Sequence, residues 1–178
     1  MCQFTKIMLK AVLFDLDGTI IDSNNAIFET YRQVSLRLNK EPPTIDTLRD
    51  LLGQPSHINL KLLFGENEKA RPIYNEVVKK THENLPTLPY VNETLKKINL
   101  PMGIVTSKRQ ENALEVLGEL NKYFSVIITP EQTIKQKPNP EPIYAACKKL
   151  SIKPKESVYI GDTIRDYQTA LNSGTEFI

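Results

Sequence analysis

The sequence contains no tryptophan, only two cysteines and two histidines. It also lacks any apolar run approaching the roughly 18 residues of a membrane-spanning helix. Cys2 falls in an end expected to be disordered and Cys147 in an apolar helical stretch, so we expect no structural disulfide. His57 and His82 are isolated, which gives no Cys/His zinc pattern, and we interpret both as surface or packed residues. Such cysteine usage fits a reducing compartment, and we predict a cytoplasmic protein.

A strong charge of either sign is also missing. Lysine and arginine number 23 and aspartate and glutamate 21, for a net charge of +2 at pH 7. This balance is too mild to predict a nucleic-acid partner. Lys6 and Lys10 interrupt the N-terminal apolar residues, which is not typical of a signal peptide. We expect neither nucleic acid nor a membrane as partner, and we expect Met8 to be the true start, with residues 1–7 as a small extension.

The composition that is present is ordinary for a globular protein. Hydrophobic residues make up 40% of the 178 residues and charged residues 25%. The length corresponds to one domain of about 150 residues, or to one domain with a smaller insertion. A chain of this size buries about 70% of the surface that its unfolded form exposes, so it can build a core without disulfides or metals.

Three stretches of the chain differ in pattern. Residues 11–14 are a continuous apolar run that ends in Asp-Leu-Asp-Gly, typical of a strand buried on both faces. Residues 23–86 have helical spacing and no convincing strand. Later residues alternate strands with helices, which predicts a doubly wound parallel sheet, and the first strand must pair within it. We therefore predict an α/β core of residues 1–22 and 87–178, with residues 23–86 inserted as a small all-helical cap.

Proline and glycine set the expected element boundaries. Pro42, Gly53, Gly65 and Gly174 each end a helical pattern. The predicted helices span 24–38, 48–52, 58–64, 67–85, 91–98, 110–120, 140–150 and 164–173, and the predicted later strands span 103–106, 126–129, 158–161 and 176–178.

Acidic residues gather where strands of the predicted sheet end, which is where open parallel sheets bind ligands. Asp15 and Asp17 follow the first strand and Asp162 follows the strand at 158–161. In extended chain Asp15 and Asp17 point the same way, and they repel unless a cation lies between them or one is protonated. With Asp162 they form a set of hard oxygen ligands that suits Mg²⁺. A helix N-cap or turn explains each aspartate alone, whereas their convergence favours a metal site.

Hydroxyl groups and lysines follow other strands at the same edge. Thr106 and Ser107 precede a predicted helix whose N-terminal amides would seat a phosphoryl oxygen, although simple N-capping explains this pair when it is taken alone. Lys108 is placed to reach an anionic substrate. Lys137 stands in a proline-rich loop, where it would neutralise the substrate or Asp15 if it is not merely solvated.

Four segments resemble, in chain order, the motifs of the haloacid dehalogenase-like superfamily: Asp15–Thr19 (DLDGT), Thr106, Lys137-Pro138 and Gly161–Asp166 (GDTIRD). The second aspartate of the first motif is the phosphotransferase form, which the dehalogenases lack. FDLDGTIIDS and KPNPEP are similar to phosphoglycolate phosphatases and their pyrophosphatase relatives. The resemblance implies a helical cap after the first strand and a Rossmann-like strand order of five-four-one-two-three. It also implies chain beyond the last strand, whereas this sequence ends at Ile178.

Chemistry and the resemblance assign the same roles. Asp15 would attack phosphorus to form an aspartyl-phosphate, and Asp17 would act as general acid and then as general base. Mg²⁺ would be held by Asp15, by Asp162 and by Asp17 through its backbone carbonyl. Asp166 would orient a metal-bound water or Lys137, if it is not simply a helix-surface charge. The residues expected to contact the substrate are Thr106, Ser107, Lys108 and Lys137.

The predicted function is therefore a Mg²⁺-dependent phosphatase that acts on a small phosphorylated metabolite as a monomer or weak homodimer. We expect small acidic phosphates or pyrophosphate to be the best substrates. The segment 53–55 (Gly-Gln-Pro) is either a substrate loop of the cap or a plain turn between helices. A sugar phosphomutase of the same superfamily is the alternative. A phospho-receiver domain also uses Asp, Thr and Lys, but it lacks the second aspartate and the cap.

Overall fold

The computed structural model describes residues 8–178, so the predictions for Cys2 and for an extension over residues 1–7 lie outside it. Within that range one parallel sheet has the order β3-β2-β1-β4-β5. This is the predicted order read from the other edge, and the α/β fold class is confirmed. The strands are β1 (Ala11–Phe14), β2 (Met102–Val105), β3 (Phe124–Ile128), β4 (Ser157–Ile160) and β5 (Glu176–Phe177).

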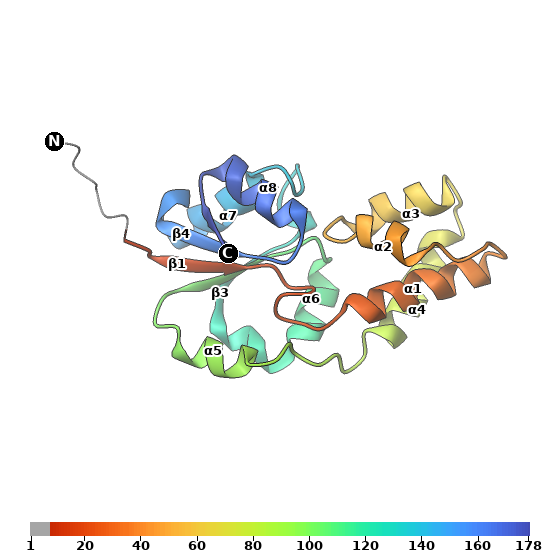
Figure 1. The fold of residues 1–178 in the computed structure, drawn as a ribbon, viewed down its shortest axis with the longest axis horizontal. Helices are drawn as coiled ribbons and strands as arrows, with labels where there is room; N and C mark the ends of the chain where they lie inside the picture. The colour runs from red at the N-terminus through yellow and green to blue at the C-terminus, as the bar shows by residue number, and fades with distance from the viewer. Residues whose placement is uncertain (1–7) are drawn as a thin grey trace.

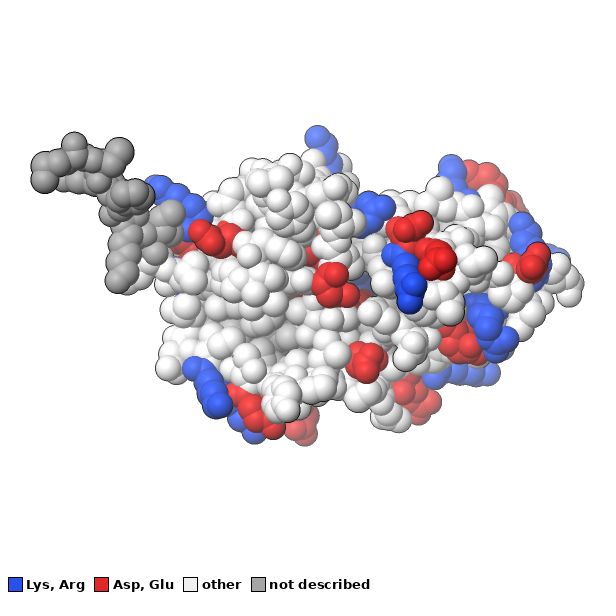
Figure 2. All heavy atoms as spheres, viewed as in Figure 1, with Lys and Arg blue, Asp and Glu red and all other residues white. Residues whose placement is uncertain are grey.

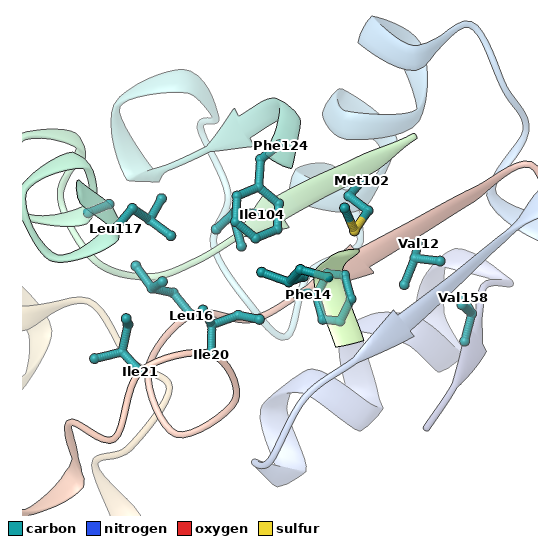
Figure 3. Packing of buried hydrophobic residues seen from close by; sticks show 12 residues of the cluster. Val12, Phe14, Leu16, Ile20, Ile21, Met102, Ile104, Leu117, Phe124 and Val158 are labelled. Atoms are coloured by element: carbon teal, nitrogen blue, oxygen red, sulfur yellow. The ribbon is translucent and has the colours of Figure 1, made fainter. Parts of the chain in front are cut away.

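Helices cover both faces of this sheet (Figure 1). Because side chains alternate along a strand, Val12 and Phe14 of the central strand pack into one core cluster and Leu13 into the other. The first cluster, drawn in Figure 3, includes Leu95 of α5 and Leu117 of α6, and the second includes residues of α7 and α8. The core helices are α5 (Val91–Lys97), α6 (Gln110–Leu117), α7 (Glu141–Leu150) and α8 (Ile164–Ser173).

Residues 23–86 form four helices and no strand, as predicted. They are α1 (Asn24–Arg37), α2 (Ile45–Asp50), α3 (Ser56–Phe64) and α4 (Ala70–Thr81), called the helical insert below. The insert has a hydrophobic cluster of its own, which includes Tyr31, Leu60 and Val77. The segments that connect the insert to the sheet, before residue 23 and after residue 86, lie side by side. The Asp22 amide donates a hydrogen bond to the Pro86 carbonyl (2.9 Å). The insert therefore leaves and rejoins the sheet at one place.

Local capping moves several predicted boundaries. The second helix begins at Ile45 rather than at residue 48, because the Thr44 hydroxyl accepts a hydrogen bond from the Thr47 amide and caps it. The helix predicted for 67–85 spans only Ala70–Thr81. The helix predicted for 110–120 ends as an α-helix at Leu117, and a 3₁₀ turn follows it. The 3₁₀ segments are Gly118–Tyr123, Pro130–Gln132 and Pro154–Glu156.

The charged side chains of the face in Figure 2 are interspersed, with lysine and arginine beside aspartate and glutamate. That face carries no stripe of one sign, which agrees with the balanced composition. Among residues 8–178, no helix has both the length and the apolar character needed to cross a membrane.

Candidate active site

Three neighbouring strands deliver polar residues to one edge of the sheet. Asp15 follows β1, Thr106 follows β2 and Asp162 follows β4, and these strands are adjacent in the sheet. Lys137, from the loop before α7, reaches the same edge. One pocket between this edge and the helical insert collects most of the predicted site residues. They are Asp15, Asp17, Thr106, Ser107, Lys108, Lys137 and Asp162.

Lys137 is the centre of a buried network. Its Nζ lies 2.8 Å from Asp15 Oδ1 and 2.6 Å from Asp166 Oδ1, and it donates to the Tyr159 hydroxyl (3.1 Å). Burial opposes the charge of Lys137, but the two carboxylates outweigh this and raise the pKa of Lys137. Asp166 also accepts from the Thr163 amide (3.1 Å) and lies within hydrogen-bond distance of Tyr159. Its oxygens are therefore occupied in holding Lys137 and the start of α8.

Carboxylates outnumber cations beside that lysine. One oxygen from each of Asp15, Asp162 and Asp166 lies within 4.8 Å of the others. Burial raises the pKa of Asp15 to about 8, with Lys137 opposing the rise and Asp166 adding to it. The pKa of Asp162 is also raised, first by burial and then by Asp166. Three carboxylates against one ammonium group leave two negative charges unbalanced when all are ionised.

Close packing brings Asp162 to this cluster. Gly18 adopts φ +80°, a left-handed conformation that favours glycine. A Cβ at this position would overlap the Asp162 carboxylate. The left-handed turn after β1 therefore favours glycine here, and a side chain would also displace the Asp162 carboxylate.

Asp17 has a different environment from Asp15. The Ser23 hydroxyl donates to Asp17 Oδ1 (2.6 Å), and Lys108 Nζ lies 3.0 Å from the same oxygen. Burial would raise the pKa of Asp17, but Lys108 and then Ser23 outweigh it and lower the pKa. Asp15 and Asp17 thus contact different lysines, and their pKa values are shifted in opposite directions.

The loop after β2 joins the sheet to the helical insert. Thr106 accepts a hydrogen bond from the Lys108 amide (3.1 Å), and Ser107 donates to the Gly53 carbonyl (2.7 Å). Gly53 and Gln54 of the predicted substrate loop line the pocket. The expected anion seat beside Thr106 and Ser107 stays a prediction; farther along the chain, the Gln110 amide faces the Glu131 carboxylate (3.3 Å). That first amide of α6 is already capped by protein.

The model of the family described as haloacid dehalogenase-like hydrolase matches residues 12–178. The chain belongs to this family. Pyrophosphatase PpaX of Oceanobacillus iheyensis is 32% identical, over 89% of this chain and 77% of that protein. Phosphoglycolate phosphatase of Rhodobacter capsulatus is 30% identical, over 96% of this chain and 84% of that protein. A haloacid dehalogenase-like hydrolase of Streptococcus pneumoniae has a TM-score of 0.82 at 23% identity, covering 95% and 83%, and shows the same fold.

Several residues that contact this site of the haloacid dehalogenase-like hydrolase were not expected from the sequence. Tyr159 of β4 is fully buried and contacts Lys137 from outside the pocket lining. His82 lines the pocket and is 8% exposed; burial, and then Lys108, lowers its pKa to about 4. Tyr31 and Asn59 reach the pocket from the insert. The insert residues followed no motif; His82 is packed, as one of the two expected alternatives, and it also lines the pocket.

Proposed function

We propose that the chain is a Mg²⁺-dependent phosphatase that hydrolyses a small phosphorylated metabolite through an aspartyl-phosphate. The convergence of Asp15, Asp162 and Lys137 at one pocket, with Asp17 beside them, carries the proposal. Family membership adds support, because the two curated relatives named above are a pyrophosphatase and a phosphoglycolate phosphatase.

The donor set fits Mg²⁺. Asp15 and Asp162 offer carboxylate oxygens, which are the hard ligands that this ion prefers. The raised pKa values of both groups indicate that the protein alone does not balance their charge. We propose that Asp15, Asp162 and the backbone carbonyl of Asp17 hold the ion. When bound, Mg²⁺ supplies charge neutralisation, so that a carboxylate can approach a phosphoryl group.

Asp15 is the proposed nucleophile. It lies at the end of the central strand, and a buried backbone and the Lys137 contact fix its position. Lys137 and Thr106 would stabilise the equatorial phosphoryl oxygens during transfer. Asp166 would keep Lys137 in place, because it holds the Nζ at 2.6 Å and is itself fully buried. Asp166 is thus a positioning residue in this proposal.

Asp17 is the proposed acid and base. Its lowered pKa favours the ionised form, which is the form that takes a proton from water when the aspartyl-phosphate is hydrolysed. In the first step, substrate phosphoryl oxygens would compete for Lys108. A weaker contact between Lys108 and Asp17 raises the proton affinity of Asp17, which lets it protonate the leaving oxygen.

The helical insert is proposed to act as a lid. We propose that residues 23–86 form a cap on a core of residues 1–22 and 87–178. The insert has a hydrophobic cluster separate from the clusters of the sheet, which supports this division. The hydrogen bond between Ser107 and Gly53 connects the insert to the sheet edge at the pocket. Replacing residues 23–86 by a short linker should leave a folded core that favours p-nitrophenyl phosphate over larger substrates. An unchanged order of substrates would contradict the lid.

The main test is phosphate release from p-nitrophenyl phosphate by purified protein. Activity should require Mg²⁺, vanish in excess chelator and return when Mg²⁺ is restored. With glucose 1-phosphate, a phosphatase releases inorganic phosphate, whereas a mutase yields glucose 6-phosphate. Full activity in chelator would refute the metal assignment, and an isomerised sugar phosphate would favour the mutase.

We also propose that the protein works in the cytoplasm as a monomer or weak homodimer. The low cysteine content supports the compartment, and the mixed charges of the visible surface are compatible with either state. Sedimentation at micromolar concentration tests the oligomeric state. A stable higher oligomer would contradict it.

A further inference from the structure

The two sides of the active-site pocket differ in charge. The sheet side carries aspartates and lysines, as described above. The residues of the helical insert that line the pocket include no lysine, arginine, aspartate or glutamate. They are neutral hydrogen-bonding groups and apolar groups, among them Gln54, Ser56, Asn59, Tyr31 and Tyr74. Lys108 and Arg109 line the pocket from the sheet side, so only the part of a substrate that reaches the insert meets an uncharged surface.

Asn59 of α3 is the most informative of these groups. It is 4% exposed, yet it lines the pocket. Its Nδ2 donates to the Tyr31 hydroxyl (3.1 Å) and to the Leu51 carbonyl (3.2 Å). A backbone carbonyl can only accept, so the contact with Leu51 fixes which end of the amide is nitrogen. Two donor contacts thereby involve the amide nitrogen, and neither involves the oxygen.

The Asn59 Oδ1 atom is buried and has no hydrogen-bond partner among residues 8–178. Native proteins pair almost all buried polar atoms, because an unpaired acceptor loses its hydration without compensation. Asn59 lines the active-site pocket, so a substrate that reaches this buried oxygen can supply its missing partner. That partner must carry a hydrogen, so a hydroxyl fits and a carboxylate or phosphate oxygen does not.

Tyrosine rings complete this subsite. Tyr31 and Tyr74 both line the pocket, and their ring centroids are 5.7 Å apart. Arg71 lies over the Tyr74 ring and donates to the Ser56 hydroxyl (3.0 Å), and it is not among the residues that line this pocket. Rings beside neutral hydrogen-bonding groups match a molecule that alternates C–H faces with hydroxyls.

We propose that the leaving group is an uncharged polyhydroxylated molecule, as in a sugar or polyol phosphate, and that one of its hydroxyls donates to Asn59 Oδ1. The inference rests on the proposed phosphatase function and names its substrate class. It departs from the expectation that small acidic phosphates or pyrophosphate are the best substrates. On the insert side of the pocket, those substrates would bring a second anion to residues that carry no positive charge, and an acceptor to the acceptor of Asn59.

The first experiment compares substrates on the unmodified protein with Mg²⁺. The panel is glucose 6-phosphate, erythritol 4-phosphate, glycerol 3-phosphate, 2-phosphoglycolate, pyrophosphate and p-nitrophenyl phosphate. A sugar or polyol phosphate should have a higher kcat/KM than 2-phosphoglycolate and pyrophosphate. Among monodeoxy analogues of the best substrate, one should lose about tenfold to hundredfold in kcat/KM, the usual effect of leaving a buried acceptor unpaired.

The second experiment removes the acceptor. Asn59→Leu keeps the side-chain size and should abolish the discrimination between the best substrate and that deoxy analogue. Ser35→Ala is the matched control, because it removes another buried hydrogen-bonding group of the insert that does not line this pocket. The control should keep the full discrimination. Thermal unfolding of both variants checks that they are folded.

The outcomes separate the two proposals. No Mg²⁺-dependent hydrolysis of p-nitrophenyl phosphate would refute the phosphatase itself. Normal hydrolysis with 2-phosphoglycolate or pyrophosphate as the best substrate would refute the substrate class alone. Equal discrimination in Asn59→Leu and in the unmodified protein would also overturn the role of Asn59. The measurements on unmodified protein decide the substrate class even if Asn59→Leu does not fold.

Discussion

The sheet side and the insert side of the pocket differ in the charge of the groups that they present. On the sheet side, charged groups are held at strand ends by short contacts, as with Lys137 between Asp15 and Asp166. On the insert side, neutral groups such as Asn59 and Tyr31 come from helices that pack on one another. Transfer of a phosphoryl group needs charges at set positions, which a rigid sheet supplies. Recognition of the leaving group needs shape and hydrogen bonds, which a separate helical unit can vary.

The largest effect expected from this comparison is on the sheet side. Asp15→Asn should lower kcat by at least about 10⁴-fold, because an amide is a poor nucleophile and no covalent phosphate can form. Phosphate release and the intact protein mass after acid quench measure both effects. Asp50→Asn, at an exposed position of the insert, is the control and should keep full activity. Activity of Asp15→Asn within tenfold of the parent would remove Asp15 from the chemistry.

Asp17→Asn should have a smaller effect with a different signature. Loss of a general acid and base lowers turnover by about 10²–10⁴-fold. With p-nitrophenyl phosphate the first step needs little protonation, so phosphate should accumulate on Asp15 and appear as added mass after acid quench. An equal loss of labelling and of turnover would leave Asp17 without a separate role in hydrolysis. A phospho-receiver domain would instead become labelled without turnover in the unmodified protein.

Metal binding should stabilise the fold in a pH-dependent way. The folded pKa of Asp15 lies near 8, above its ordinary value of 3.8, so stability from this group is lost as the pH rises towards 8 without metal. Mg²⁺ binds the ionised form and should restore that stability. A Mg²⁺ concentration of about 100 times the Kd measured at pH 8 should raise Tm by about 5–10 °C at pH 8, and the same concentration should raise it by less at pH 5. An equal rise at both pH values would contradict the sign of the Asp15 shift.

The smallest expected effect on activity comes from the contact between the sheet side and the insert side of the pocket. Ser107→Ala removes the hydrogen bond to the Gly53 carbonyl, a contact between neutral groups. Such a bond contributes about 0.5–1.5 kcal/mol, so KM for a substrate that contacts the insert should rise about two- to tenfold. Ser125→Ala, at an exposed position of β3, is the control. No change in KM would mean that this bond does not help to hold the insert over the pocket.

Much of the fold was predictable because its signals are local. A four-residue apolar run predicted β1, and alternation of strands with helices predicted the parallel sheet. Helix ends were predicted less well, because they depend on caps such as Thr44 that periodicity does not report. The cap on the first amide of α6 was not predicted, for a related reason. The Glu131 carboxylate accepts from the Gln110 amide, and the two residues are 21 apart in the chain. The local sequence around Thr106 and Ser107 therefore could not predict this cap.

By itself, the sequence determined which chemistry the protein can support. Asp15, Asp17, Thr106 and Asp162 follow strand ends, and parallel strands bring those ends to one edge whatever the details of packing. Only the tertiary structure decided the partners of these groups and the character of the insert. Lys137 meets Asp15 across 122 residues, and Asn59 meets Tyr31 across 28 residues. Such contacts, and the unpaired oxygen that results from one of them, depend on how whole helices pack, which no local pattern encodes.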